Sequence, residues 1–287
     1  MEGVLRALRA ARRFRRREFA RLACGRQAIG WLRRDFAERL RRWPETFVHE
    51  GARVRLNEAL GDEPGRTRAL AHVTRALAKE GAVRGWRGET YAVYSASGDG
   101  VLFHIERAAV HFFGLTSLAA HLNGYSGRGA GLRLFSGRRA RTKSIDPGML
   151  DTLVAGGVPS GQDAWQTLVR ECGEEAGIAR ALAERARPAG VLQVCFEVPE
   201  GLHSEILHAH DLALPADFVP RNTDGEVSEF LALQPEALLE RIGRGEMTVE
   251  AGLVAVDFML RHGLLRAPGG SVAAAVEACR LSSRSRA

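Results

Sequence analysis

The apolar positions of the first eighty residues recur at intervals of three and four, which is the period of an α-helix. Two stretches carry this pattern and stop before a helix-ending residue: Arg26–Arg42, followed by Pro44, and Thr67–Lys79, followed by Gly81. We therefore expect the start of the chain to be mainly helical.

After residue 86 the pattern changes to short apolar or alternating segments, which are typical of β-strands. The predicted strands are residues 90–94, 101–105, 117–125, 131–135, 150–154, 191–198, 205–214 and 227–233. Turns predicted at Ser97–Gly100 and Pro199–Gly201 join two pairs of these strands. The predicted helices are residues 107–113, 163–176 and 250–262, and another that begins at Pro235.

This order of elements predicts an α/β (α+β) protein, in which a small α/β/α sandwich with a mixed sheet follows a mainly helical module. We place an N-terminal accessory domain, helical with a hairpin, at residues 1–115. The sandwich is expected at residues 116–267. Residues 268–287 are rich in Gly, Ala, Ser and Arg and are expected to be a flexible tail.

The composition of the chain indicates the class of protein and its location in the cell. The chain has 287 residues, of which 45% are hydrophobic and 26% charged, as in ordinary soluble proteins. No apolar run reaches the roughly 18–20 residues that span a bilayer, so we expect no membrane partner. Residues 1–19 are Arg-rich and lack the apolar core of a signal peptide, and a mitochondrial presequence is the alternative. Four scattered cysteines without a CxxC pair indicate reduced thiols and a cytoplasmic location.

The net charge of +7 raises the hypothesis of a nucleic-acid partner. Only Lys79 and Lys143 are lysines, so nearly all of the positive charge is arginine, in a chain rich in Ala, Gly and Leu. Such a composition is typical of a GC-rich genome. We interpret the arginines as solvated helix faces and expect no nucleic-acid partner, and the oligomeric state, monomer or homodimer, is left open.

Three carboxylates carry the first chemical signal. Glu171, Glu174 and Glu175 stand at positions i, i+3 and i+4 of a predicted helix and therefore share one face. Carboxylates this close repel one another unless a cation compensates, and Mg²⁺ prefers such oxygen ligands together with substrate phosphates. The Gly-rich residues 156–161 precede the helix, where backbone amides and the helix N-terminus favour a phosphate.

The residues around this triplet resemble the signature of the Nudix family, G-x₅-E-x₇-R-E-U-x-E-E-x-G-U, where U is a bulky apolar residue. The matching positions are Gly156, Arg170, Glu171, Cys172, Glu174, Glu175, Gly177 and Ile178. One position departs, because Gln162 stands where the signature has glutamate. Gln162 can still accept a hydrogen bond from Arg170 but brings no charge, and Asp163 is a candidate to compensate.

The resemblance implies a hydrolase of a diphosphate bond in a small molecule, with Mg²⁺ or Mn²⁺ held by Glu171, Glu174 and Glu175. Arg170 would orient the carboxylates. Members of the family recruit a general base from a later loop, for which Asp224, Glu226 and Glu229 are candidates here, and we favour Glu226.

Flanking motifs are similar to the Nudix subfamily related to thiamine pyrophosphokinase. The motifs are Cys24–Gly30, Trp86–Val93, Ile105–Ala109, His121–Tyr125, Arg138–Lys143, Asp146–Gly157, Phe218–Val227 and Asp257–Gly263. This similarity implies that thiamine diphosphate, or its oxidised derivatives, is hydrolysed to the monophosphate. The predicted substrate contacts are Arg138, Arg139, Lys143, His121, Asn123, Tyr125, Gly156 and Gly157. Arg87 could line the same cleft, whereas Trp86 is expected in the core.

Three alternatives remain. A hydrolase of nucleoside-diphosphate sugars or dinucleotides fits the same signature, since the signature does not select the leaving group. A non-catalytic ligand-sensing regulator would fit Gln162, but such a protein has no reason to keep the metal triplet. Isopentenyl-diphosphate isomerase needs a cysteine before the signature, and the segment His121–Tyr125 has none.

Overall fold

The second half of the chain folds around one mixed β-sheet. The computed structural model describes residues 1–95, 100–143, 145–265 and 270–281. The sheet runs in the order β11-β12-β7-β8-β13, with β10 paired to β7 and β9 to β8. Its strands are β7 (Thr116–Ser126), β8 (Arg133–Arg139), β9 (Leu150–Thr152), β10 (Val154–Gly157), β11 (Arg187–Val198), β12 (Gly201–Ala213) and β13 (Val227–Leu233). Since β7 and β12 are parallel and the other neighbours antiparallel, the expected mixed sheet is confirmed.

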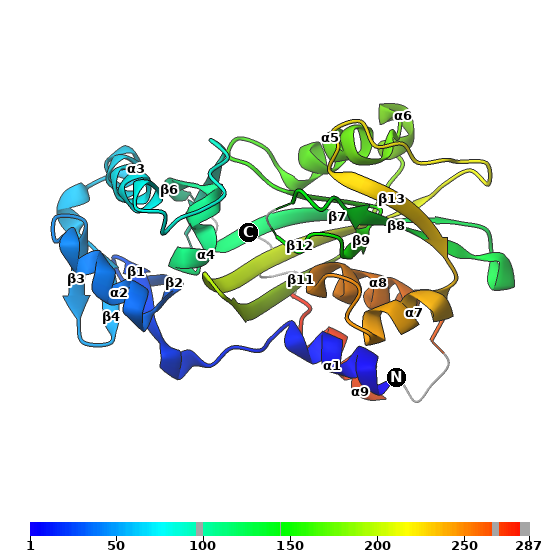
Figure 1. Ribbon diagram of the computed structural model, residues 1–287, viewed down its shortest axis with the longest axis horizontal. Coiled ribbons are helices and arrows are strands. Elements are labelled where there is room, and N and C mark those ends of the chain that lie inside the picture. Colours follow the sequence, from blue (N-terminus) through cyan, green and yellow to red (C-terminus); the bar gives the residue numbers. More distant parts are fainter. Residues whose placement is uncertain (96–99, 144, 266–269, 282–287) are drawn as a thin grey trace.

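Helices on both faces of this sheet complete the expected α/β/α sandwich (Figure 1). One face carries α5 (Ala164–Ala176) and α6 (Arg180–Ala183), and the other carries α1 (Glu2–Ala10), α7 (Pro235–Gly243), α8 (Val249–Arg261) and α9 (Gly270–Glu277). Ala120 and Leu122 of β7 share a buried cluster with Leu168 of α5, so odd-numbered positions of β7 face the α8 side. In the described part of the chain, every helix is too short or too polar to cross a membrane.

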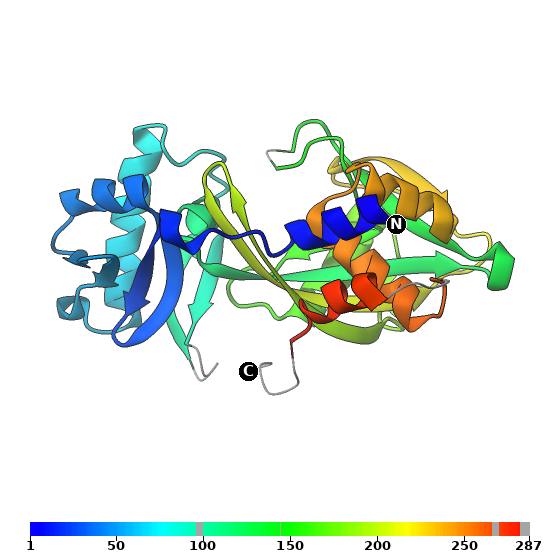
Figure 2. The same ribbon diagram turned by 90° about the horizontal axis from the view of Figure 1, so that it is seen from below.

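Residues 14–113 form the N-terminal module, which lies beside the sandwich along the long axis of the molecule (Figure 2) and has a hydrophobic core of its own. It combines a four-stranded sheet of order β2-β1-β4-β3 with the hairpin β5-β6. Its elements are β1 (Phe19–Cys24), β2 (Gln27–Arg33), α2 (Arg34–Arg39), β3 (Phe47–Glu50), β4 (Arg53–Leu56), α3 (Glu63–Lys79), β5 (Thr90–Tyr94), β6 (Val101–Glu106) and α4 (Val110–Phe113).

The prediction of a mainly helical start is wrong at residues 26–42. Gln27–Arg33 is a strand that pairs with β1, and only Arg34–Arg39 is an α-helix. Gly25 turns the chain between the two strands with a φ of 56°, a backbone conformation that favours glycine. Leu22 and Leu32 of the paired strands are both buried in the core of the module. Tertiary pairing thus outweighs the helical spacing of the apolar residues.

Most other predicted elements lie within a few residues of their expected bounds. The predicted helix at residues 67–79 is the larger part of α3, and the predicted strands at 90–94 and 227–233 match β5 and β13. Of the predicted turn Ser97–Gly100, residues 97–99 lie outside the described residues. The amide of Ser95 donates to the carbonyl of Gly100 (2.9 Å) across this connection.

The first and the last described helices join the core of the sandwich. Val4 and Leu8 of α1 are buried in the same cluster as Val272 and Val276 of α9. The prediction of a flexible tail is therefore wrong over Gly270–Glu277, because two valines one helical turn apart give that segment an apolar face to bury. Likewise, α1 packs on the sandwich although it precedes the N-terminal module in sequence.

Candidate active site

Local sequence fixes where α5 begins and ends. The Asp163 carboxylate accepts from the amide of Gln166 (2.7 Å), while the Gln166 side chain accepts from the amide of Asp163 (3.1 Å). This capping box satisfies backbone donors at the helix start. Gly177 ends the helix in the left-handed conformation, with a φ of 63°. With Leu168 and Cys172 fully buried in the core, Glu171 and Glu175 lie against β10, whereas Glu174 stays half exposed beside Arg170.

Two glycines of β10 allow very close contacts at this site. A Cβ on Gly156 would lie 2.5 Å from Cγ of Glu171, and a Cβ on Gly157 would lie 1.9 Å from the hydroxyl of Tyr91. Both distances are far below ordinary carbon contacts of about 3.5–4.0 Å. The two positions therefore need glycine so that the helix carboxylate and the tyrosine can approach the backbone.

Glu175 is the most deeply buried of the three glutamates, with 6% of its surface exposed. Its carboxylate accepts from the amide of Ala155 in β10 (2.9 Å). Burial, together with repulsion from Glu171 and Asp151, raises the pKa of Glu175 well above its ordinary value. Burial also raises the pKa of Glu171, to which repulsion from Glu174 adds. The charged forms of these residues thus lack full compensation from the protein.

Arg170 pairs with two of the glutamates. Its Nη2 donates to Glu171 (2.8 Å) and its Nη1 to Glu174 (2.5 Å). Its Nε is buried and has no hydrogen-bond partner among the described residues. The predicted contact with Gln162 is absent there, because the Gln162 side chain accepts from the Thr167 hydroxyl (3.2 Å) instead. Asp163 does not compensate either, since its carboxylate is used in the capping box.

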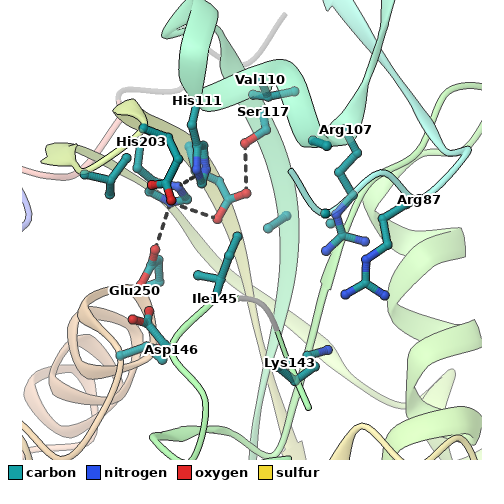
Figure 3. Close-up of a pocket in the computed structure, with 18 of the residues that line it drawn as sticks. Arg87, Arg107, Val110, His111, Ser117, Lys143, Ile145, Asp146, His203 and Glu250 are labelled. Carbon is teal, nitrogen blue, oxygen red and sulfur yellow. Dashed lines mark hydrogen bonds and ion pairs between the residues drawn. The ribbon is translucent and has the colours of Figure 1, made fainter. Parts of the chain in front are cut away.

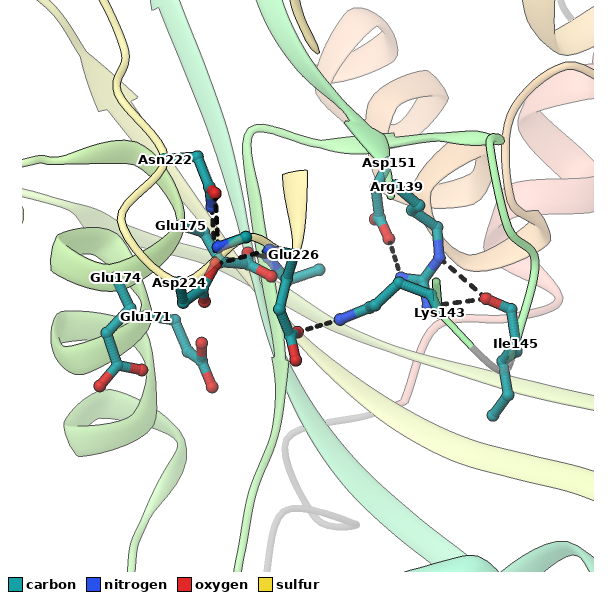
Figure 4. Close-up of polar contacts among 12 residues, drawn as sticks. Arg139, Lys143, Ile145, Asp151, Glu171, Glu174, Glu175, Asn222, Asp224 and Glu226 are labelled. Atoms are coloured by element: carbon teal, nitrogen blue, oxygen red, sulfur yellow. Dashed lines mark hydrogen bonds and ion pairs between the residues drawn. The ribbon is translucent and has the colours of Figure 1, made fainter. Parts of the chain in front are cut away.

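A later loop adds a carboxylate to the group. Ligand oxygens of Glu171, Glu174 and Asp224 all lie within 4.8 Å of one another (Figure 4). The loop is docked on the end of α5, where the amide of Thr223 donates to the carbonyl of Glu174 (2.9 Å). Asn222 donates to the Asp224 carboxylate (2.6 Å) and orients it. Hard oxygen ligands with incompletely compensated charge fit a divalent cation such as Mg²⁺ or Mn²⁺.

Cations face this carboxylate group. Lys143 donates to Glu226, and Arg87 of the N-terminal module lies 3.9 Å from the same carboxylate. Arg139 donates to Asp151 (2.8 Å) and to the carbonyl of Ile145 (3.0 Å), as Figure 4 shows. Each of these cations is held in place by its contact, and together they supply positive charge next to the carboxylates.

A cavity of about 920 Å³ lies between the sandwich and the N-terminal module. The module contributes Tyr91 and Arg107 to its wall, and the sandwich contributes both glycines of β10. Arg107 donates to Glu89 (2.8 Å) and lies over the ring of Tyr91, 5.7 Å from its centre. A volume of this size is typical of sites for small-molecule ligands.

Five of the predicted substrate contacts line this cavity: His121, Arg139, Lys143, Gly156 and Gly157. The predicted contact with Asn123 is wrong, because Asn123 is buried and donates to Asp211 (3.0 Å). The predicted contact with Tyr125 is wrong as well, because its ring packs against Phe258 of α8. Both residues share the β7 face of His121, but α8 covers that part of the face.

The predicted contact with Arg138 is wrong for a different reason. Neighbouring residues of a strand point to opposite faces, so Arg138 and Arg139 cannot line the same cavity. Arg138 pairs with its register partner Glu229 of β13 (2.7 Å). Glu229, one of the three candidate general bases, is thus held in an ion pair with Arg138. Trp86, expected in the core, is 42% exposed, whereas Arg87 does line the cavity.

Sequence reasoning missed several residues of the cavity wall: Tyr91, Arg107, His111, His203, Glu205 and Glu250. Two local signals were available. Tyr91 and Arg107 lie within the flanking motifs Trp86–Val93 and Ile105–Ala109. His203 and Glu205 stand two positions apart on a predicted strand and so share a face. The rest meet through the packing of the module on the sandwich, which no local pattern reveals.

Comparisons with known proteins bear on both halves of the chain. A family model described as "NUDIX domain" matches residues 126–249, and one described as "Domain of unknown function (DUF4743)" matches residues 3–117. The chain is 40% identical over 259 residues to "Nudix hydrolase 24, chloroplastic" of Arabidopsis thaliana, covering 87% of this chain and 69% of that protein. It is 39% identical over 266 residues to "Nudix hydrolase 20, chloroplastic" of the same plant, with the same coverage.

Among solved structures, the chain is similar to DR0079 from Deinococcus radiodurans, with 26% identity and a TM-score of 0.46. That match covers 59% of this chain and 99% of the other. The part of this chain that lies outside the match is thus about two fifths of its length.

Proposed function

Because the chain belongs to the Nudix hydrolase family and is an enzyme that cleaves diphosphate bonds, we propose that its substrate is thiamine diphosphate or an oxidised derivative. The products would be the monophosphate and inorganic phosphate. The observation that carries the proposal is the cavity of about 920 Å³, which continues from the glycines of β10 into the N-terminal module. It offers room and an aromatic wall for a ring system beyond the diphosphate. The flanking motifs around His121–Tyr125 and Arg138–Lys143 support the same substrate.

We propose that Glu171, Glu174 and Glu175, joined by Asp224, hold Mg²⁺ or Mn²⁺. When bound, the cation supplies charge neutralisation on the diphosphate oxygens. Arg170 holds two of these carboxylates in place through its paired donors. Arg139 and Lys143 would bind phosphate oxygens, for which guanidinium and ammonium groups are suited.

Glu226 is the proposed general base. It would take a proton from the attacking water as the new bond to phosphorus forms, and the P–O bond to the monophosphate leaving group breaks. Lys143, which donates to Glu226, keeps this carboxylate beside the carboxylate group of α5. Glu175 and Glu226 also line one small pocket together with Lys143, which supports this arrangement.

The substrate is tested by phosphate release in Mg²⁺ from a panel of thiamine diphosphate, oxidised thiamine diphosphate and ADP-ribose. We expect kcat/KM to be at least tenfold higher for a thiamine compound than for ADP-ribose. Equal or better cleavage of ADP-ribose would refute the thiamine assignment and favour a nucleoside-diphosphate substrate.

The base is tested with Glu226→Gln beside the matched control Glu229→Gln. A lost general base lowers kcat by about 10²–10⁴-fold with little change in KM. Glu229 pairs with Arg138, away from the cavity, so its variant is expected to retain wild-type kcat. Equal kcat values for the two variants would remove Glu226 from this role.

The cation is tested with Glu175→Gln, for which Glu184→Gln is the control, because Glu184 is the exposed C-terminal cap of α6 and pairs with Arg180. Removing a buried carboxylate that faces the cation is expected to raise the Mg²⁺ concentration needed for half-maximal activity. A Glu175→Gln enzyme with the wild-type Mg²⁺ dependence would contradict this role.

A further inference from the structure

The N-terminal module presents one cation to the active site that the mechanism above does not use. Arg87 lies in the loop before β5 and lines the cavity of the candidate site. Its side chain is 41% exposed, and its Nη1 lies 3.9 Å from Oε1 of Glu226, the proposed general base. This contact is longer than a hydrogen bond, so Glu226 does not use the Nη1 donor.

The neighbouring cations have closer counter-charges. Figure 3 shows Arg107 and Lys143 on the same side of the cavity as Arg87. Arg107 donates to Glu89 (2.8 Å), and Lys143 donates to Glu226. Glu226 is thus already in contact with an ammonium group. Within the described part of the chain, Arg87 has no ion pair other than the long one to Glu226, so its charge is the least compensated of the three.

The carboxylates on the opposite side of the cavity have cations of their own. Nε2 of His203 lies 2.8 Å from Oε1 of Glu250 and 3.6 Å from Oε2 of Glu205. Burial opposes the charged form of His203, but attraction to the two carboxylates outweighs it and raises the pKa of His203 to about 10. Glu205 is also attracted to Arg107. These carboxylates therefore do not serve as counter-charges for Arg87.

The backbone that carries Arg87 is anchored inside the module. The amide of Arg87 donates to the buried carboxylate of Glu106 (3.0 Å), which also accepts from the amide of Ala108 (3.3 Å). The amide of Arg107 donates to the carbonyl of Glu89 (2.8 Å). These three bonds tie the loop before β5 to the segment after β6. Arg87 thus extends toward the sandwich from a fixed backbone, which reduces the entropy that it loses on binding a ligand.

The position of Arg87 beside Glu226 indicates which atoms of a substrate it can reach. A general base lies within hydrogen-bond distance of the attacking water, and that water lies about 3–3.5 Å from the phosphorus that it attacks. A guanidinium 3.9 Å from this base is therefore close to the non-bridging oxygens of the attacked phosphoryl group. The planar fork of N–H donors on an arginine matches such oxygens, and the group stays protonated.

We propose that Arg87 is a catalytic residue supplied by the N-terminal module, and that its guanidinium binds the non-bridging oxygens of the terminal phosphoryl group. Water forms the new bond to this phosphorus and gives its proton to Glu226. The bond from phosphorus to the bridging oxygen breaks, and that oxygen leaves with the monophosphate. Arg87 transfers no proton and neutralises charge on the phosphoryl oxygens. The inference rests on the proposed function through the place of Glu226, and it holds for any diphosphate substrate.

The first test is the binding of methylenediphosphonate, a diphosphate analogue that cannot be hydrolysed, to the full chain in Mg²⁺. Calorimetric titration is expected to show a Kd at least tenfold higher for Arg87→Met, because a charge-assisted contact is lost. Arg75→Met is the matched control, since it removes the same charge from an exposed position on α3 and should keep the wild-type Kd. A Kd for Arg87→Met within twofold of wild type, or no wild-type binding at millimolar concentration, would overturn the proposal.

A second background separates direct contact with the phosphate from an effect through the base. Arg87→Met is introduced into Glu226→Gln, and the same titration is repeated. If Arg87 touches the phosphate, the substitution raises Kd by the same factor in this background, because the two effects are independent. If it has no effect there, Arg87 acts only through Glu226 and the proposal fails.

Hydrolysis of thiamine diphosphate gives the last test. Arg87→Ala should lower kcat by about 10²–10³-fold, as the loss of one donor to a transition state does. Guanidinium chloride, at concentrations too low to unfold the protein, should restore part of this kcat, which it would not do for a side chain with a purely structural role. An unchanged kcat in Arg87→Ala would refute the proposal. If the wild type does not cleave thiamine diphosphate, the proposed substrate fails, whereas the methylenediphosphonate titration still decides the role of Arg87.

Discussion

Gly156→Ala gives the sharpest test of how β10 and α5 form the site. The added Cβ would lie 2.5 Å from Cγ of Glu171 and 2.6 Å from both Cδ and Oε1. Ordinary contacts of this kind are about 3.5–4.0 Å, so the Glu171 carboxylate must retreat by about 1 Å. Because a glutamate side chain can rotate, we expect a stability loss near the lower end of the 1–3 kcal/mol that overpacking costs, about 1 kcal/mol.

Activity should fall much more than stability. A displacement of about 1 Å in a catalytic group lowers the rate by about 100-fold, and Glu171 is a proposed cation ligand. The control is Gly173→Ala on the same helix, where a Cβ would meet no heavy atom within 4 Å. Alanine in a helix interior is favoured over glycine by about 1 kcal/mol, so this variant should be more stable and fully active.

The assay is phosphate release at several Mg²⁺ concentrations, with thermal unfolding followed by circular dichroism. Gly156→Ala should lower the free energy of unfolding, whereas Gly173→Ala should raise it. The value of kcat/KM should be much lower for Gly156→Ala than for Gly173→Ala. If folded Gly156→Ala keeps kcat/KM within twofold of Gly173→Ala, the close approach of β10 does not control Glu171, and the interpretation of Gly156 is refuted.

Three other predictions follow from the contacts described above. Gln162→Glu should supply the missing acceptor for Nε of Arg170 and raise the unfolding midpoint by an amount equivalent to about 1 kcal/mol, measured by thermal melting. Arg139→Met should raise KM for the diphosphate about tenfold, whereas Arg138→Met should leave KM unchanged in the same steady-state assay. The stability that the raised pKa of His203 contributes is complete below its ordinary value of 6.5 and is lost as pH rises toward about 10, so urea unfolding should show a decline over that window that His203→Gln reduces.

The sequence predicts the candidate site correctly where its residues lie close together in the chain. Glu171, Glu174 and Glu175 could be placed on one helical face because the spacing of a helix is fixed. Asp224 is about fifty residues away, and its approach depends on a loop that docks on α5 through Thr223. No pattern in the sequence predicts that docking, so the choice among later carboxylates could not be made from the sequence alone.

The wrong predictions of substrate contacts on β7 and β8 have a common physical cause. A shift of one residue in a strand reverses the face to which each side chain points, and the sequence of β8 does not reveal which of Arg138 and Arg139 faces inward. On β7, Asn123 and Tyr125 share the face of His121, but α8, more than a hundred residues later, covers that part of the face. Contacts between distant segments decide which positions of a strand stay accessible.

The contact between α1 and α9 has a consequence for the order of folding. These helices come from opposite ends of the chain and bury Val4 and Val276 in one cluster. During synthesis α1 emerges long before α9, so α1 cannot reach its final position until α9 and the elements between the two helices have been made. Contacts this distant in sequence form slowly, because a large loop must close first. The N-terminal module, whose core is built from its own residues, is free to form long before the sandwich closes.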